Sequence, residues 1–256
     1  MSDGPGLSIV IPAWNEEDRL PRTLERYLPA LEARGEPFEV IVVADGQADR
    51  TVDVAQAFAA RGVRVLTFSE KQGKGGAILA GLRAARYDLV GYLDADGPIP
   101  PDEIARLVSA LDGADCVVAS RWTRGSVILA PEPWINRVAG RAWNLLVRSI
   151  LFLPIRDTQC GAKFLRRSIL EPTLRAVALT NRAFDVDLLY HLRKQGRAVR
   201  EMPVTWRHDP GSRMPIAGAV PVMFLSLLGI RVMNLPFGRR VPPGWVRFFL
   251  HRWGQV

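Results

Sequence analysis

The chain has 256 residues, with 48% hydrophobic and 23% charged residues, an ordinary globular balance that allows one large α/β domain or two small ones. Its two cysteines, Cys116 and Cys160, do not suggest a disulfide framework, so we expect a protein of the reducing cytoplasm, and residues 1–6 lack the features of a signal peptide. The net charge of +8 favours anionic partners such as nucleic acid, phosphorylated small molecules or an acidic membrane face, without choosing among them.

Short apolar runs recur through the first 120 residues. Because they lack polar alternation, they predict strands that are buried on both faces of a parallel sheet. The predicted strands are Leu7–Ile11, Glu39–Ala44, Val63–Thr67, Leu89–Leu93 and Cys116–Ser120.

Helical patterns lie between these strands. Apolar residues recur at helical spacing from Leu20 to Leu31 and again from Ile104 to Leu111, with Asp102 predicted as the N-cap of the second helix. The alternation predicts a doubly wound, Rossmann-like α/β domain with helices on both faces of a mostly parallel sheet.

The distinctive polar residues follow the predicted strands directly. Residues 12–16 follow the first strand, Asp45 and Gly46 the second, and residues 94–97 the fourth. Ligands bind at the carboxyl ends of the strands in such sheets, so these segments predict one shared site.

Asp94 and Asp96 converge on one ion only if the chain turns between them, which Gly97 and Pro98 favour. Two carboxylates with open coordination positions suit Mg²⁺ or Mn²⁺, either of which would offset charge on a departing nucleoside diphosphate. The alternative is a solvated acid pair in a turn.

Basic residues supply candidate phosphate contacts. The glycine-rich segment 71–76 precedes a helical stretch, so its amides and Lys74 could meet phosphate, or it could simply be a helix-entry loop. Asp45 could bond a ribose or a base edge, or form an ordinary turn with Gly46. The candidate pyrophosphate clamps are Arg121, Arg207 and Arg213.

The strand–helix alternation stops near Thr123. We expect a catalytic domain over residues 1–215, with a nucleotide-sugar half (1–122) and an acceptor half (123–215), followed by a membrane-associating tail over 216–256. The apolar run Ile216–Ile230 would reach only about 22 Å as a helix, too short to span a bilayer but long enough to lie in its interface. The alternative is a helix that packs on the core.

Several motifs together resemble glycosyltransferase family 2, whose members have the GT-A fold, and within it the dolichyl-phosphate β-glucosyltransferases. The broad signals are Ile9–Glu16, Val42–Gly46 and the Asp94–Asp96 pair. The narrower signals, of which the second is the most specific, are Gly73–Ala77, Arg156–Lys163, Ala183–Tyr190 and Val204–Arg213.

The resemblance implies roles for individual residues. Asp94, Ala95 and Asp96 would meet the metal and the diphosphate, with Asp96 the nearest ligand, and the three arginines would contact phosphates. The nucleoside pocket would be lined by Pro12, Trp14, Glu16, Val43 and Asp45. The chain departs from the family pattern at Ala44, Gln47 and Gly97-Pro98 and has Trp14 where tyrosine is usual, which bears on base and sugar identity.

The resemblance further implies transfer of a hexose, with inversion, from a nucleotide sugar to a polyprenyl or dolichyl phosphate at the cytoplasmic face of a membrane. UDP-glucose is the favoured donor and GDP-mannose the alternative; the oligomeric state is left open. A phosphate monoester has a second pKa near 6, so the acceptor is largely ionised and needs no strong base. Asp157 and Asp185 would then orient substrate hydroxyls, whereas a hydroxyl acceptor would require one of them as the base.

Two rival functions remain at this stage. One is a soluble family 2 transferase acting on a hydroxyl acceptor, and the other a non-catalytic basic module that binds membranes. We expect no nucleic-acid partner, because the usual recognition motifs are absent from the sequence.

Overall fold

The computed structural model of the protein describes residues 5–46, 48–130, 133–207 and 216–235. Strands and helices alternate up to β5 and then follow a less regular order. The strands are β1 (Leu7–Ala13), β2 (Phe38–Asp45), β3 (Val63–Phe68), β4 (Leu89–Tyr92), β5 (Cys116–Ser120), β6 (Val127–Ala130), β7 (Lys163–Arg166), β8 (Val199–Pro203) and β9 (Thr205–Arg207). The helices are α1 (Leu20–Glu32), α2 (Thr51–Gln56), η1 (Ala59–Arg61), α3 (Gly73–Ala84), α4 (Pro101–Ser109), α5 (Trp134–Leu151), η2 (Arg167–Ile169), α6 (Leu170–Ala176), α7 (Phe184–Lys194) and α8 (Ile216–Met233).

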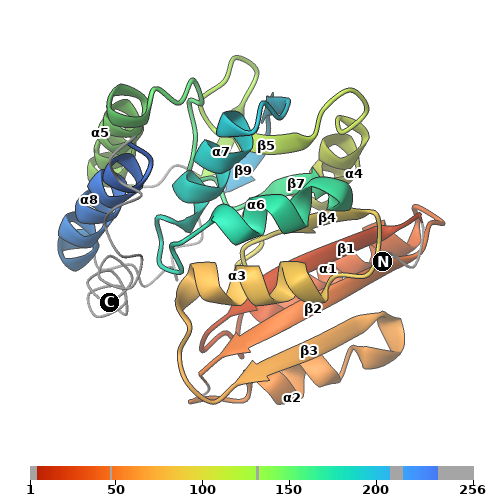
Figure 1. The fold of residues 1–256 in the computed structure, drawn as a ribbon. Helices are drawn as coiled ribbons and strands as arrows, with labels where there is room; N and C mark the ends of the chain where they lie inside the picture. Colours follow the sequence, from red (N-terminus) through yellow and green to blue (C-terminus); the bar gives the residue numbers. More distant parts are fainter. Residues whose placement is uncertain (1–4, 47, 131–132, 208–215, 236–256) are drawn as a thin grey trace.

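Seven strands form one twisted sheet in the order β3-β2-β1-β4-β7-β5-β8 (Figure 1). All neighbours are parallel except β7, which runs antiparallel between β4 and β5. The five predicted strands are confirmed as β1 to β5, and the prediction of a mostly parallel sheet is confirmed with them. A separate two-stranded sheet pairs β6 with β9.

Helices cover both faces of the sheet. On β2, Val40 and Val42 join the core beneath α1, α2 and α4, whereas Ile41 and Val43 join the core beneath α3, α6 and α7. Because successive residues of a strand point to opposite faces, a strand that is covered on both sides reads as an unbroken apolar run. This burial explains why the sequence pattern identified the strands.

Two local predictions are wrong. Asp102 is not the N-cap of α4: Pro100 holds that position and Pro101 is the first helical residue, which suits proline because that position needs no N–H donor. Asp102 lies in the first turn instead, where its charge faces the positive end of the helix dipole. The second error concerns residues after 123, where β6, β7, β8 and β9 are strands that the sequence pattern did not indicate.

The apolar run that begins at Ile216 forms the helix α8, which contacts α5. Leu227 and Ile230 are fully buried and belong to the same core as α3 and α7, and the Ser226 hydroxyl accepts a 2.9 Å hydrogen bond from Asn181. One side of α8 therefore packs on the α/β domain. A search of the described residues identifies no helix with the length and apolar character that crossing a bilayer requires. The predicted tail beyond residue 235 lies outside the described part of the chain.

Candidate active site

The carboxyl ends of β1, β2 and β4 meet at one edge of the sheet, as the topology requires. Residues 12–16, Asp45 and residues 94–97 all leave the sheet there, because β1 pairs in parallel with both β2 and β4. The glycine-rich start of α3 reaches the same edge. Segments far apart in the sequence therefore form one site.

A tight turn places the two acids that follow β4. The Gly97 amide donates a 3.2 Å hydrogen bond to the Asp94 carbonyl, and Gly97 adopts a φ of +57°. The Thr23 hydroxyl of α1 donates a 2.7 Å hydrogen bond to the Ala95 carbonyl, and a Cβ at position 97 would lie 2.9 Å from that hydroxyl. The turn needs glycine for both its backbone conformation and its contact with α1.

Asp94 forms an ion pair with a lysine side chain. Lys74 Nζ lies 2.7 Å from Asp94 Oδ1. Burial alone would raise the pKa of Asp94, but Lys74 holds the pKa below its usual value. In turn, burial would lower the pKa of Lys74, and Asp94 with Asp185 holds it above its usual value.

Asp96 lacks an equivalent neutralising contact. Its Oδ1 is buried and makes no hydrogen bond to a described residue. Burial, with repulsion from the Asp94 carboxylate, raises the pKa of Asp96 to about 7, although Arg19 and Lys74 oppose the shift. A buried carboxylate oxygen with no donor is a costly arrangement unless a ligand satisfies it.

The acids of this turn fit a divalent cation that is completed by substrate. No group of three or more His, Cys, Asp or Glu side chains within the described ranges could hold a metal ion. Mg²⁺ and Mn²⁺ bind through one or two carboxylates and take phosphate oxygens and water as further ligands. The orphaned oxygen of Asp96 therefore suits an ion that arrives with a diphosphate.

The loop after β1 contributes an aromatic ring and an acid to this edge. Trp14 is half exposed, and Lys71 Nζ lies 3.9 Å from the centre of its ring. Glu16 pairs with Arg19 at 2.6 Å, and its amide donates to the Thr51 hydroxyl. Pro12 is partly buried at the base of this loop.

Two residues predicted to line the nucleoside pocket lie deeper than the loop. Val43 is fully buried against α3, where a Cβ at Gly81 would lie 3.0 Å from its Cγ2, so its side chain packs in the core. Asp45 is also buried, and its two carboxylate oxygens accept hydrogen bonds from the amides of Gln72 and Gly73. Burial raises the pKa of Asp45, and these two amides oppose the rise. Asp45 thus fixes the start of α3, which carries Lys74.

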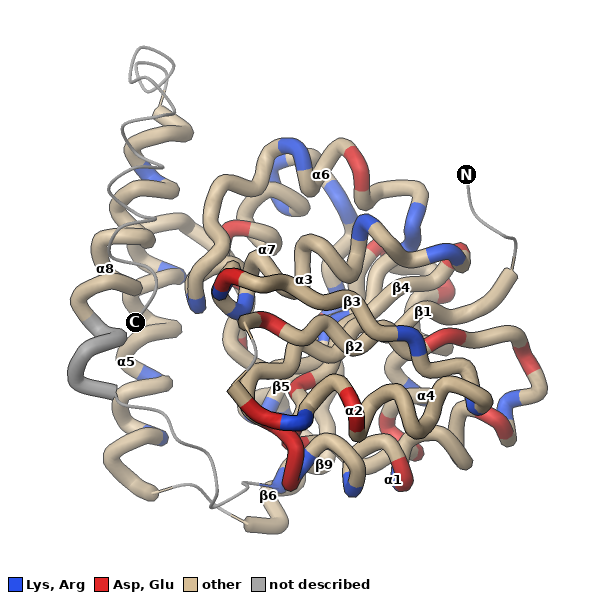
Figure 2. The backbone as a smooth tube through the Cα atoms, turned by 90° about the horizontal axis from the view of Figure 1, so that it is seen from below, with Lys and Arg blue, Asp and Glu red and all other residues tan. Residues whose placement is uncertain are grey.

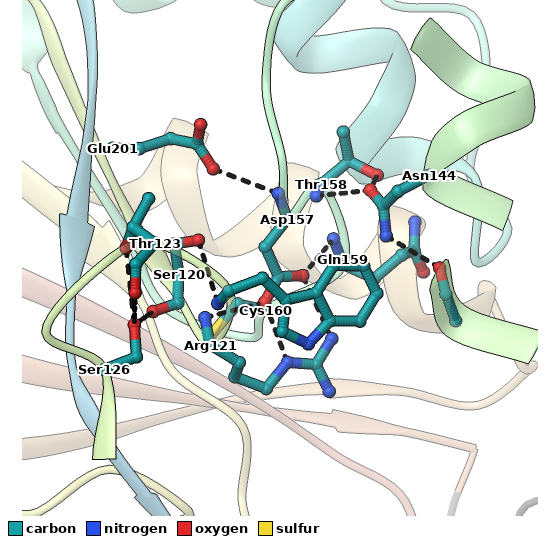
Figure 3. Close-up of polar contacts among 12 residues, drawn as sticks. Ser120, Arg121, Thr123, Ser126, Asn144, Asp157, Thr158, Gln159, Cys160 and Glu201 are labelled. Carbon is teal, nitrogen blue, oxygen red and sulfur yellow. Dashed lines mark hydrogen bonds and ion pairs between the residues drawn. The ribbon is translucent and has the colours of Figure 1, made fainter. Parts of the chain in front are cut away.

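The motif Arg156–Lys163 crosses directly over the acid turn. A Cβ on Gly161 would lie 1.7 Å from Asp94 Oδ2, so only glycine fits there. Earlier in the motif, Asp157 is fully buried and bonds Arg121 in a fork, with Oδ2 2.8 Å from Nε and Oδ1 3.0 Å from Nη2 (Figure 3). Arg121 lowers the pKa of Asp157 against the effect of burial. Two predicted functional residues are therefore partners of each other.

Asp185 is paired in the same way. It accepts a 2.5 Å hydrogen bond from Lys163 Nζ and a 2.6 Å hydrogen bond from the Tyr92 hydroxyl. Lys163 is itself fully buried and also donates to the Cys160 carbonyl. Asp185 thus lies in a buried network with Lys163 and Tyr92, near enough to Lys74 to help raise the pKa of that lysine.

The two remaining predicted arginines come from the end of the acceptor half. Arg207 ends β9 and is exposed, and its amide donates a 2.9 Å hydrogen bond to the Pro98 carbonyl. This bond ties β9 to the acid turn. Arg213 lies outside the described residues.

Sequence reasoning gave no role to three residues that shape the site. Lys163 is the counterion of Asp185, and its position at the start of the short strand β7 is the sequence feature that could have indicated a buried charge. Arg182 is partly buried near Asp94: burial lowers its pKa and Asp94 opposes that shift. Asn144 of α5 accepts hydrogen bonds from the amide and the hydroxyl of Thr158 at 2.9 and 2.8 Å (Figure 3). No sequence pattern indicates the Asn144 contact, because it joins distant segments.

Chemically, this edge can bind a nucleotide and its diphosphate. It offers an aromatic ring, an acid that lacks a donor, a lysine at a helix start and a basic strand end. Such an arrangement stabilises a charged leaving group by position and electrostatics.

The chain belongs to glycosyl transferase family 2, whose sequence model matches residues 8–174. It is 32% identical to the dolichyl-phosphate beta-glucosyltransferase of Drosophila melanogaster over 99% of this chain and 79% of that protein. The human dolichyl-phosphate beta-glucosyltransferase is also 32% identical, over 90% of this chain and 76% of that protein.

Solved structures agree on the fold. Glucosyl-3-phosphoglycerate synthase from Mycobacterium tuberculosis, in complex with Mn²⁺ and UDP-glucose, superimposes with a TM-score of 0.64 and 21% identity, over 88% of this chain and 79% of that chain. The predicted GT-A fold and family are confirmed, and the protein is a glycosyltransferase.

Proposed function

We propose that this enzyme transfers glucose from UDP-glucose to a polyprenyl phosphate, with inversion, in the presence of Mg²⁺ or Mn²⁺. The observation that carries the proposal is the contrast between Asp96, which has a buried oxygen without a donor, and the paired acids Asp157 and Asp185. The first needs a ligand at the sheet edge, whereas the others are already neutralised. The names of the two relatives support the sugar and the lipid phosphate.

At the donor end, Asp96 would be the closest metal ligand, with Asp94 beside it. A divalent ion held there would neutralise the charge that develops on the departing UDP. Lys74 adds positive charge at the start of α3, held in place by its 2.7 Å contact with Asp94. Trp14 and Glu16 contact the nucleoside from the loop after β1. Asp45 and the backbones of Pro12, Val43 and Ala95 complete its pocket.

At the acceptor end, the phosphate oxygen is the nucleophile. It is largely dianionic at neutral pH, so the enzyme must position it and screen its charge. Asp157 is held by Arg121 and Asp185 by Lys163, so both carboxylates are already engaged, which argues against proton abstraction from the acceptor by either one. We assign phosphate contacts to Arg207, Arg213 and Arg121, and positioning roles to the two acids. In-line attack on an α-linked donor then gives the β product that the relatives' names specify.

The location follows from the acceptor. A polyprenyl phosphate resides in a membrane, so the enzyme acts peripherally at a membrane surface. The described cysteines, Cys116 and Cys160, are buried free thiols, as expected on the reducing cytoplasmic face.

A donor panel tests this function. Purified enzyme with Mn²⁺ or Mg²⁺ and a polyprenyl phosphate is given labelled UDP-glucose, GDP-mannose or UDP-N-acetylglucosamine in parallel. We expect label in the lipid phase from UDP-glucose, and loss of that label with EDTA. No transfer to lipid phosphate from any donor would contradict the proposal. Transfer only to a hydroxyl acceptor would indicate the rival soluble transferase.

A further inference from the structure

Exposed apolar side chains concentrate on two neighbouring helices. Among the residues that the structure describes, the large hydrophobic side chains exposed on α5, on α8 and just after these helices are Trp134, Ile135, Val138, Leu145, Leu146, Phe152, Phe224, Leu225, Leu228, Val232 and Leu235. Trp14 and three residues of β6 are the others with such exposure. Figure 1 shows α5 and α8 side by side at the margin of the molecule, on the side toward which the carboxyl ends of β1 to β3 point.

The helix α5 has its apolar side turned outward. Trp134, Val138, Leu145 and Phe152 fall at a spacing that places them on one face, and Trp134, Leu145 and Phe152 are 73%, 63% and 74% exposed. The opposite face buries Asn144. A helix that lies on a protein in water ordinarily shows its polar face to the solvent, so this orientation requires an apolar partner.

Positive charge flanks the apolar stripe. Arg137, Arg141 and Arg148 are exposed on α5, and Arg231 of α8 lies 5.3 Å from the ring centre of Phe152. Neither helix contains an aspartate or a glutamate in its sequence. In Figure 2, both helices show blue segments and no red ones, whereas red and blue segments mix over the rest of the domain.

We propose that the outer faces of α5 and α8 together form a docking surface for a bilayer that contains anionic lipids. Below, this surface is called the α5–α8 face. Exposed Trp, Leu and Phe side chains would enter the headgroup region while the arginines contact lipid phosphates. The inference rests on the proposed function in one respect, since it supplies the surface on which a lipid-borne acceptor reaches this site. Part of this surface is formed by α5, which lies in the middle of the sequence, and not only by the C-terminal tail that the sequence predicted.

A polar link joins this face to the active site. The Asn144 side chain, on the inner side of α5, accepts both hydrogen bonds from Thr158, and Asp157 next to it holds Arg121 (Figure 3). Gly161, further along the same loop, lies against Asp94. Docking through α5 would therefore fix the orientation of the loop that covers the acid turn with respect to the membrane.

Flotation of the full-length chain with vesicles tests the proposal. The vesicles contain phosphatidylcholine alone or a mixture with phosphatidylglycerol. We expect binding to the mixed vesicles. Leu145→Glu should weaken this binding about tenfold or more, because a charge replaces an apolar side chain in the interface. Arg141→Glu should weaken it about fivefold or more, given the energy of one basic residue near an anionic surface.

A matched control separates local effects from net charge. Arg83 is exposed on α3, far along that helix from the site, so Arg83→Glu changes the charge as Arg141→Glu does. We expect Arg83→Glu to change vesicle binding by no more than about twofold, because it lies away from the docking surface. Unchanged circular dichroism and melting temperature for Leu145→Glu would show that it still folds, as its 63% exposure predicts.

Several outcomes would overturn the proposal. One is equal binding of Leu145→Glu and the wild type to the mixed vesicles. Another is vesicle binding that depends only on residues after 235. The third is a dimer that Leu145→Glu dissociates while its vesicle binding stays unchanged. A water-soluble, short-chain isoprenyl phosphate separates this inference from the proposed function. With that acceptor and no vesicles, Leu145→Glu should transfer glucose at the wild-type rate. If neither the wild type nor Leu145→Glu transfers glucose to this soluble acceptor, while Leu145→Glu still weakens vesicle binding, the proposed function fails and the docking surface stands.

Discussion

Two sets of acidic side chains lie within the same site and differ in what neutralises them. In the acceptor half, Asp157 and Asp185 are buried against Arg121 and Lys163. At the edge of the sheet, Asp96 keeps a buried oxygen without a donor, and its pKa is raised to about 7 by burial and by its neighbour Asp94. The paired acids Asp157 and Asp185 maintain the architecture of the site, whereas the unpaired oxygen of Asp96 is available to bind a ligand. A substitution in the first set should therefore change stability, and one in the second should change catalysis.

The strongest test of the structural set removes the cation beneath the site. Lys163→Met leaves Asp185 buried without its counterion, which typically costs about 3–5 kcal/mol of unfolding free energy. Urea denaturation measures this loss. The double variant Lys163→Met/Asp185→Asn should regain much of it, because the uncompensated charge is gone. A single variant as stable as the wild type would contradict the assigned pairing.

The functional set responds in the opposite way. Asp96→Asn should reduce kcat/KM about 100-fold to 1000-fold, a size typical of losing one electrostatic contact to the transition state. The melting temperature should stay the same or rise, because the substitution removes a charge that burial and Asp94 disfavour. Steady-state kinetics and calorimetry measure the two effects. Full activity, or a large loss of stability, would place Asp96 in the structural set instead.

The Asp157 pair has a characteristic pH dependence. Arg121 lowers the folded-state pKa of Asp157, so the pair contributes stability above the unfolded-state pKa of about 3.9, and this stability is lost as the pH falls through the lower folded-state value. Asp157→Asn should cost about 2 kcal/mol at pH 7, and the difference from the wild type should shrink below about pH 4. Denaturation curves across this range measure the difference. A gap that does not change with pH would argue against an ionised pair.

The last prediction concerns the link to α5. Asn144→Ala removes the acceptor of both Thr158 hydrogen bonds and should cost about 1–3 kcal/mol. It should also lower kcat through the 157–161 loop, while vesicle binding stays at the wild-type level, since Asn144 faces inward. Asn144→Asp, which keeps an acceptor, is the control that should recover part of kcat. Equal kcat values for both variants and the wild type would separate this link from catalysis.

The sequence allowed prediction of what depends on local pattern. The strands β1 to β5 are buried on both faces and read as apolar runs, and parallel pairing fixes where their polar ends meet. The predicted cluster of residues 12–16, Asp45 and 94–97 is accordingly present in the structure. The helices α1 and α4 also follow from their apolar spacing.

Pairing across the chain could not be predicted in this way. The strand β7 has only four residues and enters the sheet antiparallel between β4 and β5, a choice made by tertiary packing. The partners Lys74–Asp94, Arg121–Asp157 and Lys163–Asp185 also join separate segments. Both Asp157 and Asp185 were candidates for a base in the sequence, and only their buried counterions indicate otherwise.

Calorimetric titration of UDP in the presence and absence of Mn²⁺ tests the central contrast most directly. The account predicts that Mn²⁺ strengthens UDP binding to the wild type and to Asp157→Asn, and that this strengthening is lost in Asp96→Asn. If UDP bound equally with and without the ion, or if Asp96→Asn kept the dependence on Mn²⁺, the assignment of Asp96 as a metal ligand would be wrong.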